Sequence, residues 1–303
     1  MGAPSKGRGK AKNTLALVDA AFHILAEIQP ATVRAVCYRL FIDGLIPSMA
    51  KANTDKVSRH LVWAREQELL PWFWIVDETR VAERIASWSN PEEIIDSAVR
   101  QYRKDYSQLQ PRRIEVLSEK GTVRGTLAAV LEKYGVTFRV MHGYGSATSL
   151  YGIAQETADN PKPLTMLYVG DWDPSGMQMS EVDLPDRLQR YGGAATIKRV
   201  ALDESDVAPG TELPFFEAES KAKDPRFKWF VEHYGRRCWE VDALSPVVLR
   251  QRVEAEILAL LDVDAWNHCI KIEHAERESM QTVLGAWSIS MQASKCSPAG
   301  GAA

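Results

Sequence analysis

Residues 164–176 read LTMLYVGDWDPSG, and they give the clearest indication of a parallel sheet in this chain of 303 residues. The first six, Leu164–Val169, are mostly apolar, which is typical of a strand covered on both faces. Two aspartates separated by one residue, Asp171 and Asp173, follow the strand directly. Since Asp, Pro and Gly are also ordinary turn residues, the pattern alone leaves both a solvated loop and a functional site open.

Three further runs in the chain resemble strands, namely Ile114–Leu117, Val136–Met141 and Ile197–Leu202. Helical patterns of about a dozen residues separate the runs, and this alternation indicates a parallel α/β sheet. Glu119 follows the first run as Asp171 and Asp173 follow the third. The carboxyl ends of parallel strands meet at one sheet edge, where ligands bind, so we expect the three carboxylates to lie together.

Carboxylate oxygens are the ligands that Mg²⁺ prefers, and Mn²⁺ is a possible substitute. The acidic pattern includes neither histidine nor thiolate, which disfavours zinc. His268, Cys269 and His274 are close in sequence but lack the remaining ligands of a zinc site. The sequence therefore predicts a magnesium site formed by Glu119, Asp171 and Asp173.

The N-terminal part predicts three helices, at Thr14–Glu27, from the N-cap Thr32 to Gly44, and at Asn53–Gln67. The run Leu70–Val76 that follows is aromatic and β-branched, which predicts a strand. This order is that of a winged helix, whose third helix reads the DNA groove, although other small helical domains share part of it. The basic residues that we expect to contact DNA are Lys51, Lys56, Arg59 and Arg65.

Composition agrees with a soluble globular protein, with 45% hydrophobic and 25% charged residues and a net charge of −3. No apolar run reaches the length of about 18 residues that suggests a membrane span, and no secretory signal is apparent. The four cysteines are scattered, which argues against a disulfide framework and for a reducing cytoplasm. They are Cys37, Cys238, Cys269 and Cys296.

Three motifs in order resemble a Toprim domain: VLSEK at 116–120, GYGSAT at 143–148 and LYVGDWDPSG at 167–176. The chain is most similar to the A subunit of topoisomerase VI and to the meiotic double-strand-break proteins, over roughly residues 112–205. The segment IKRVALD at 197–203 also resembles that family. The resemblance implies that Glu119, Asp171 and Asp173 bind Mg²⁺ for chemistry on DNA. Gly143 and Gly145 either admit phosphate to backbone N–H groups or form a tight turn.

The same family carries a DNA-cleaving tyrosine on the second helix of its winged helix, in a pattern like R-x-x-aromatic-Tyr. Here the sequence is Arg34-Ala-Val-Cys-Tyr38, with Cys37 in place of the aromatic residue. The resemblance therefore nominates Tyr38 as nucleophile, and Arg34 on the same helical face would favour its phenolate form. Without the resemblance, a tyrosine on such an amphipathic helix is ordinary packing.

Together these observations predict an α/β protein with an N-terminal winged-helix domain, a Toprim domain and C-terminal helices. The expected boundaries are 1–12 for a basic disordered tail, 13–80 for the winged helix, 81–111 for a helical connector interrupted at Asn90-Pro91, 112–265 for the Toprim domain, and 266–303 for a helical segment with a disordered tail.

We expect a topoisomerase-VI-A-like enzyme that cleaves double-stranded DNA in the cytoplasm, in association with the nucleoid. Tyr38, Arg34 and Glu119 would be catalytic, and Glu119 would also carry a proton to the leaving oxygen. The resemblance implies a homodimer and, for a full topoisomerase, a separate ATPase-bearing B-type subunit, with no membrane partner. The alternatives are a Toprim nuclease that uses metal-activated water and a winged-helix DNA-binding protein without catalysis.

Overall fold

The computed structural model describes residues 12–76, 85–141 and 147–296, except for the side chains of Lys12 and of residues 288–296. The basic tail before Lys12 and the glycine-rich turn Gly143–Gly145 lie outside these ranges. The chain divides into two compact units. One unit spans Met1–Val81 and Arg113–Ala259, and the other spans Ala82–Arg112 and Leu260–Ala303.

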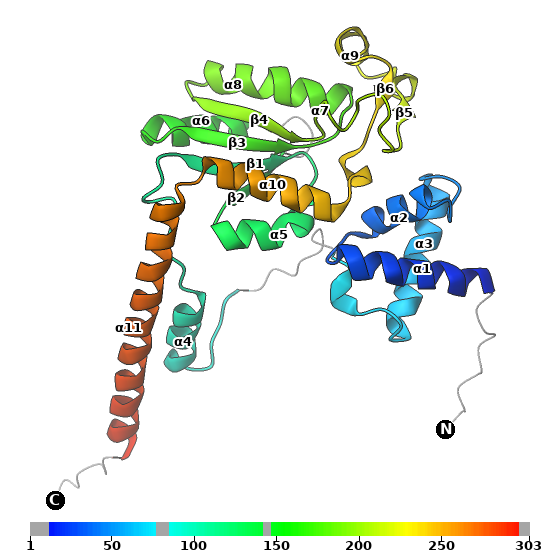
Figure 1. Cartoon of the computed structure of the whole chain (residues 1–303). Coiled ribbons are helices and arrows are strands. Elements are labelled where there is room, and N and C mark those ends of the chain that lie inside the picture. The colour runs from blue at the N-terminus through cyan, green and yellow to red at the C-terminus, as the bar shows by residue number, and fades with distance from the viewer. Residues whose placement is uncertain (1–11, 77–84, 142–146, 297–303) are drawn as a thin grey trace, which may run out of the picture. The chain divides into compact units, whose positions relative to one another are not determined.

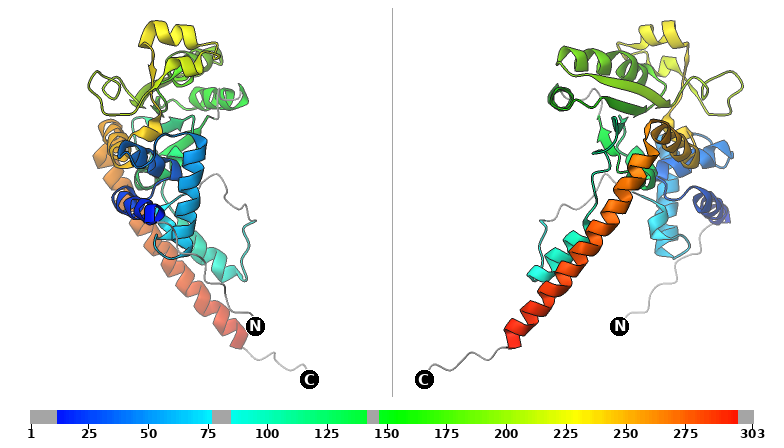
Figure 2. Two further views of the ribbon diagram at one scale, coloured as in Figure 1. Left: turned by 90° about the vertical axis from the view of Figure 1, so that its right-hand side faces the viewer. Right: turned by 60° about the vertical axis from the view of Figure 1, so that its left-hand side comes forward.

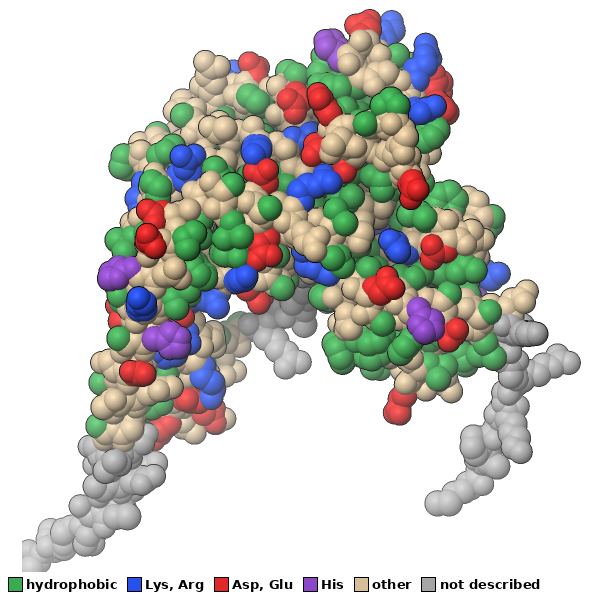
Figure 3. Space-filling model, in the orientation of Figure 1, with side chains coloured by type: hydrophobic (Ala, Val, Ile, Leu, Met, Phe, Trp, Pro, Cys, Tyr) green, Lys and Arg blue, Asp and Glu red, His purple; other side chains and the backbone are tan. Residues whose placement is uncertain are grey.

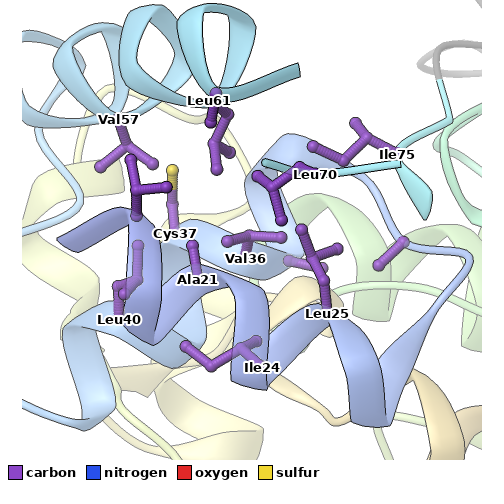
Figure 4. Packing of buried hydrophobic residues seen from close by; sticks show 14 of the residues in the cluster. Ala21, Ile24, Leu25, Val36, Cys37, Leu40, Val57, Leu61, Leu70 and Ile75 are labelled. Carbon is purple, nitrogen blue, oxygen red and sulfur yellow. The ribbon is translucent and has the colours of Figure 1, made fainter. Parts of the chain in front are cut away.

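The first unit begins with three helices, α1 (Lys12–Ile28), α2 (Val33–Ile42) and α3 (Lys51–Glu66), as the sequence predicts. Thr32 is the N-cap of α2, where its Oγ1 accepts a hydrogen bond from Ala35 N at 3.2 Å. The apolar faces of the three helices meet in one cluster (Figure 4). Its labelled members include Leu25, Val36 and Leu61, which are almost fully buried.

The predicted strand at Leu70–Val76 is wrong. Trp72–Trp74 forms a short 3-10 helix, and the segment makes only an isolated parallel bridge, between Ala31 and Ile75. Pro71 precedes the turn and has no N–H to give to a sheet ladder. Trp72 and Phe73 are also exposed, and this segment forms no strand ladder with the described residues. Residues 12–76 thus contain the helix order of a winged helix without a β-hairpin after α3.

A four-stranded parallel sheet forms the centre of the first unit, with the strand order β2-β1-β3-β4. The strands are β1 (Arg113–Ser118), β2 (Thr137–Val140), β3 (Leu164–Val169) and β4 (Ala195–Ala201). All six residues of β3 are buried, as its apolar run predicts. Ser118 pairs with Val169. Because of this register, the segments after β1 and β3 leave the sheet side by side.

Helices cover both faces of this sheet (Figure 1). On one face, α6 and α8 pack over Met166 and Tyr168. On the other face, α5 and α10 lie together, joined by the ion pair of Lys133 with Glu254 at 2.8 Å. The helix bounds are α5 Val123–Tyr134, α6 Ala147–Asp159, α7 Pro174–Gln178, a π-helical turn Met179–Asp183, α8 Leu184–Arg190 and α10 Pro246–Leu260.

A small lobe lies between β4 and α10 in the sequence. It contains the antiparallel pair β5 (Phe216–Glu217) and β6 (Arg237–Cys238), the helix α9 (Phe227–Tyr234), and the 3-10 turns Ala218–Lys221 and Val241–Ala243. Backbone hydrogen bonds join Trp172 and Trp239 in both directions at 2.9 Å. The lobe is therefore fastened to the segment that follows β3.

The second unit pairs α4 (Pro91–Gln101) with the long helix α11 (Val263–Cys296), and both views of Figure 2 place the two helices beside each other. The prediction of helix on both sides of Asn90-Pro91 is corrected here, since Ile85–Trp88 is not helical. Asn90 begins α4 instead of interrupting a helix, because its side chain accepts a hydrogen bond from Glu93 N at 2.9 Å. Among the described residues, no helix is both long and apolar enough to span a membrane.

Candidate active site

The three predicted carboxylates gather at the carboxyl edge of the sheet. Glu119 directly follows β1, and Asp171 and Asp173 follow the neighbouring β3. The pKa of Glu119 is raised, first by burial and then by the negative charges of Asp171 and Asp173. The three side chains therefore follow neighbouring strand ends, and the charges of the two aspartates act on Glu119.

Asp171 is held in place by two donors on one oxygen. Its Oδ1 accepts hydrogen bonds from Val241 N at 2.8 Å and from Lys120 Nζ at 2.9 Å. Burial raises its pKa, and the ammonium group of Lys120 opposes that rise. Its Oδ2 receives no hydrogen bond from the described residues, so one oxygen remains for a ligand.

Asp173 combines a turn function with a place in the site. Its extended backbone precedes α7, and its Oδ1 accepts a hydrogen bond from Gly176 N at 2.8 Å, which caps that helix. A Cβ on Gly176 would lie 2.3 Å from the backbone oxygen of Asp171, so this position requires glycine. The second oxygen of Asp173, Oδ2, lies 3.2 Å from Lys221 Nζ.

A divalent cation fits these residues by ligand chemistry, since all three offer hard carboxylate oxygens. In the present arrangement, however, the described residues contain no group of three or more His, Cys, Asp or Glu side chains placed to hold a metal ion. Lys120 and Lys221 supply the positive charge instead. Binding of a cation by Asp173 Oδ2 therefore requires Lys221 to move aside, whereas Asp171 Oδ2 receives no hydrogen bond from the described residues.

A second acidic pair beside the site was missed at the sequence level. Lys120 Nζ lies 3.0 Å from Asp242 Oδ2 and 3.7 Å from Glu240 Oε2. Arg34 of α2 also pairs with Glu240, and its Nε lies 3.1 Å from Asp242 Oδ2. The available signal was the alternation in WEVDA at 239–243, where two acids stand between buried apolar residues.

Tyr38 lies on the buried side of α2 and is only 6% exposed. The Arg34 guanidinium carbon lies 5.5 Å from the centroid of its ring. Burial raises the pKa of Tyr38 most, the carboxylate of Glu240 raises it further, and Arg34 opposes both. The cation that the sequence predicts is therefore present, but its effect is outweighed, and in this conformation Tyr38 stays a neutral phenol.

Arg199 of β4 stabilises the turn that carries both aspartates by hydrogen bonds to its backbone oxygens. Its side chain is 8% exposed, and its guanidinium carbon lies 4.8 Å from the centroid of the Tyr168 ring. The guanidinium donates to the backbone oxygens of Gly176 at 2.7 Å, Leu202 at 3.1 Å, and Gly170 and Asp171 at 3.3 Å, and to Ser180 Oγ at 2.8 Å. Arg199 thus aligns the site without contacting its carboxylates.

The residues predicted to contact DNA lie on α3, apart from the carboxylates in sequence. Lys51, Lys56 and Arg59 are exposed on this helix. Arg65 is half-buried, and its guanidinium carbon lies 4.7 Å from the centroid of the Trp72 ring. Three of the four side chains are therefore accessible to a phosphate backbone, whereas Arg65 packs against Trp72.

Comparisons of this chain with protein-family models, with curated proteins and with solved structures found no match. The structure itself shows a parallel sheet flanked by helices, with three acidic residues after its strand ends, and a helical N-terminal part.

Proposed function

We propose that this chain cleaves double-stranded DNA in a reaction that depends on a divalent cation, as its resemblance to Toprim proteins implies. The observation that supports this most is the meeting of Glu119 with Asp171 and Asp173 at the ends of adjacent strands. Mg²⁺, or Mn²⁺ in its place, would be held by these three carboxylates. The chemistry that the ion supplies when bound is neutralisation of charge on the phosphate oxygens.

In this proposal Tyr38 is the nucleophile. Its oxygen bonds to phosphorus while the bond from phosphorus to one sugar oxygen breaks. The phenolic proton passes to Glu240, whose carboxylate is close enough to raise the pKa of the phenol. The leaving oxygen takes a proton that Glu119 passes on from solvent, and Arg34 balances the charge near the phenol. The product is a phosphotyrosine link that retains the energy needed for resealing.

The burial of Tyr38 supports a second candidate, a nuclease in which activated water attacks. A phenol that is 6% exposed and next to Glu240 must leave its present position before it can reach a phosphate. The transesterase therefore requires α2 to move, so that the phenol reaches a carboxylate site in the same chain or in a second copy, as the homodimer implied by the resemblance allows. A separate ATPase-bearing subunit belongs to the same proposal.

Incubation of the protein with supercoiled plasmid and Mg²⁺ or Mn²⁺ tests the proposal, with products run before and after protease digestion. The transesterase releases cut DNA only after protease treatment, and mass spectrometry finds a nucleotide on the peptide that contains Tyr38. Tyr38→Phe then abolishes cutting. The matched control is Tyr151→Phe, which removes a hydroxyl from a side chain that is 53% exposed.

Cutting by Tyr38→Phe at the parent rate, with no adduct, would establish the nuclease instead. Asp171→Asn removes cutting under either mechanism, because a ligand carboxylate is lost. A parent protein that cuts under neither metal would leave only the DNA-binding alternative without catalysis.

A further inference from the structure

Residues 221–237, within the lobe between β4 and α10, are more basic than the helix predicted to read DNA. Within 221–237, six Lys and Arg residues stand against two acidic residues, Asp224 and Glu232, in a chain of net charge −3. Helix α3 has four basic and two acidic residues. We call residues 221–237 the basic lobe, and its six basic residues are Lys221, Lys223, Arg226, Lys228, Arg236 and Arg237.

Several of these charges are available to a ligand. Lys223, Lys228, Arg236 and Arg237 are exposed, and Figure 3 shows Lys and Arg side chains over α9 and the β5–β6 pair, with acidic ones among them. Lys223 and Lys228 form no ion pair with the described residues. The Arg237 guanidinium carbon lies 4.3 Å from the centroid of the Phe215 ring, which is itself 45% exposed. Such a surface suits a polyanion better than an apolar partner.

The basic lobe also adjoins the carboxylate site directly. Lys221 Nζ contacts Asp173, and the backbone of Trp239 pairs with that of Trp172, between the two aspartates. Three carboxylates repel a phosphodiester chain, so a nearby positive surface is needed to hold the chain beside them. Helix α3 is joined to the site by no such contact among the described residues.

We propose that the basic lobe binds the phosphodiester backbone of duplex DNA next to the carboxylate site, with Lys223, Lys228 and Arg237 as contacts. The identity of the ligand rests on the proposed function, while the location of the surface rests on the lobe's own charges and on its junction with Asp173. Arg226 and Arg236 contribute less, because Asp224 and Glu219 already pair with them.

The test is fluorescence anisotropy of a labelled duplex of arbitrary sequence, titrated with protein in EDTA over a range of salt concentrations. The variants are the double substitution Lys223→Ala with Lys228→Ala, and Arg237→Ala alone. The control, Arg190→Ala with Lys271→Ala, removes two exposed charges from α8 and α11. Circular dichroism verifies that each variant is folded.

Each lost phosphate contact lowers the slope of log K against log salt by about 0.9. We therefore expect the double variant to lower the slope by about 1–2 and Arg237→Ala to lower it by up to about 1, with the control unchanged. Unchanged slopes in the lobe variants, an equal loss in the control, or no binding of duplex by the parent would overturn the proposal. Equal affinity of the parent for polyglutamate would also overturn it, by indicating an acidic protein as the partner.

Omission of metal separates this result from the proposed cleavage. If the parent binds duplex through the basic lobe but never cuts plasmid, the binding surface is supported and the proposed cleavage is refuted. If the parent cuts plasmid while the lobe variants bind duplex with parental affinity and slope, the proposed cleavage is supported and the binding surface is refuted.

Discussion

Replacement of Gly176 by alanine tests the turn that carries Asp171 and Asp173. The new Cβ would lie 2.3 Å from a backbone oxygen of Asp171, so the main chain itself must shift. Overpacking of this kind costs about 1–3 kcal/mol. The shift also disturbs the 2.8 Å hydrogen bond from Gly176 N to Asp173 Oδ1, a helix cap worth about 1 kcal/mol. We therefore expect Gly176→Ala to lower the free energy of unfolding by about 2–4 kcal/mol.

Urea unfolding followed by far-UV circular dichroism and tryptophan fluorescence measures this loss as a lower midpoint at an unchanged m-value. Gly152→Ala is the matched control, because it lies in the helix α6 and its Cβ would meet no atom within 4 Å. That substitution should stabilise the protein by about 0.5–1 kcal/mol through helix propensity. The steric reasoning is refuted if Gly176→Ala unfolds at the parental midpoint, or if both substitutions shift the midpoint upward.

Three further predictions concern single side chains. The pKa of Glu119 is raised in the folded protein, which means that its ionisation opposes folding. Glu119→Gln should therefore be more stable than the parent at pH 7 and equally stable below the ordinary glutamate pKa of about 4.3. Equal urea midpoints of the two proteins at pH 7 would contradict this. Arg199→Leu leaves several buried oxygens without a donor and should cost about 3–5 kcal/mol, with Arg199→Lys intermediate; a parental melting temperature for the leucine variant would argue against the clamp. Burial raises the pKa of Cys37 to about 11 and that of Cys238 to about 12. Both thiols should therefore resist iodoacetamide at pH 8 in the native protein. Rapid alkylation of either cysteine, measured by peptide mass spectrometry, would contradict this.

The parallel sheet could be predicted because its signal is local and unambiguous. A run of six apolar residues such as β3 is stable as a strand only when both faces are covered, and helices of suitable length flank it. The meeting of Glu119 with Asp171 follows from one further rule, that parallel strands share a carboxyl edge. That step also needed β1 and β3 to be adjacent, which the order β2-β1-β3-β4 provides and the sequence alone does not specify.

The positive charges and the second acidic pair of the site could not be predicted in the same way. Lys221 and Asp242 lie in 3-10 turns, and Glu240 directly precedes the second of these turns. Such short segments have no periodicity to reveal which way a side chain points. At Leu70–Val76 the reverse occurred. Aromatic residues gave a strand signal, but β-propensity reflects fit to a half-buried sheet surface, and Pro71 together with the exposed Trp72 denies the segment such a surface.

The sequence D-x-D-P-x-G left a turn and a metal site as alternatives, yet the geometry makes the two compatible. The Oδ1 of Asp173 accepts the hydrogen bond that caps the helix, and its Oδ2 lies 3.2 Å from Lys221 Nζ. Asp171 gives Oδ1 to Val241 N and Lys120 and keeps Oδ2. Capping and backbone hydrogen bonds fix the orientation of both carboxylates before any ion arrives, which reduces the ordering cost of binding. Turn chemistry is thus the means by which two like charges are held together, and Lys221 is the group that a cation at Asp173 Oδ2 has to replace.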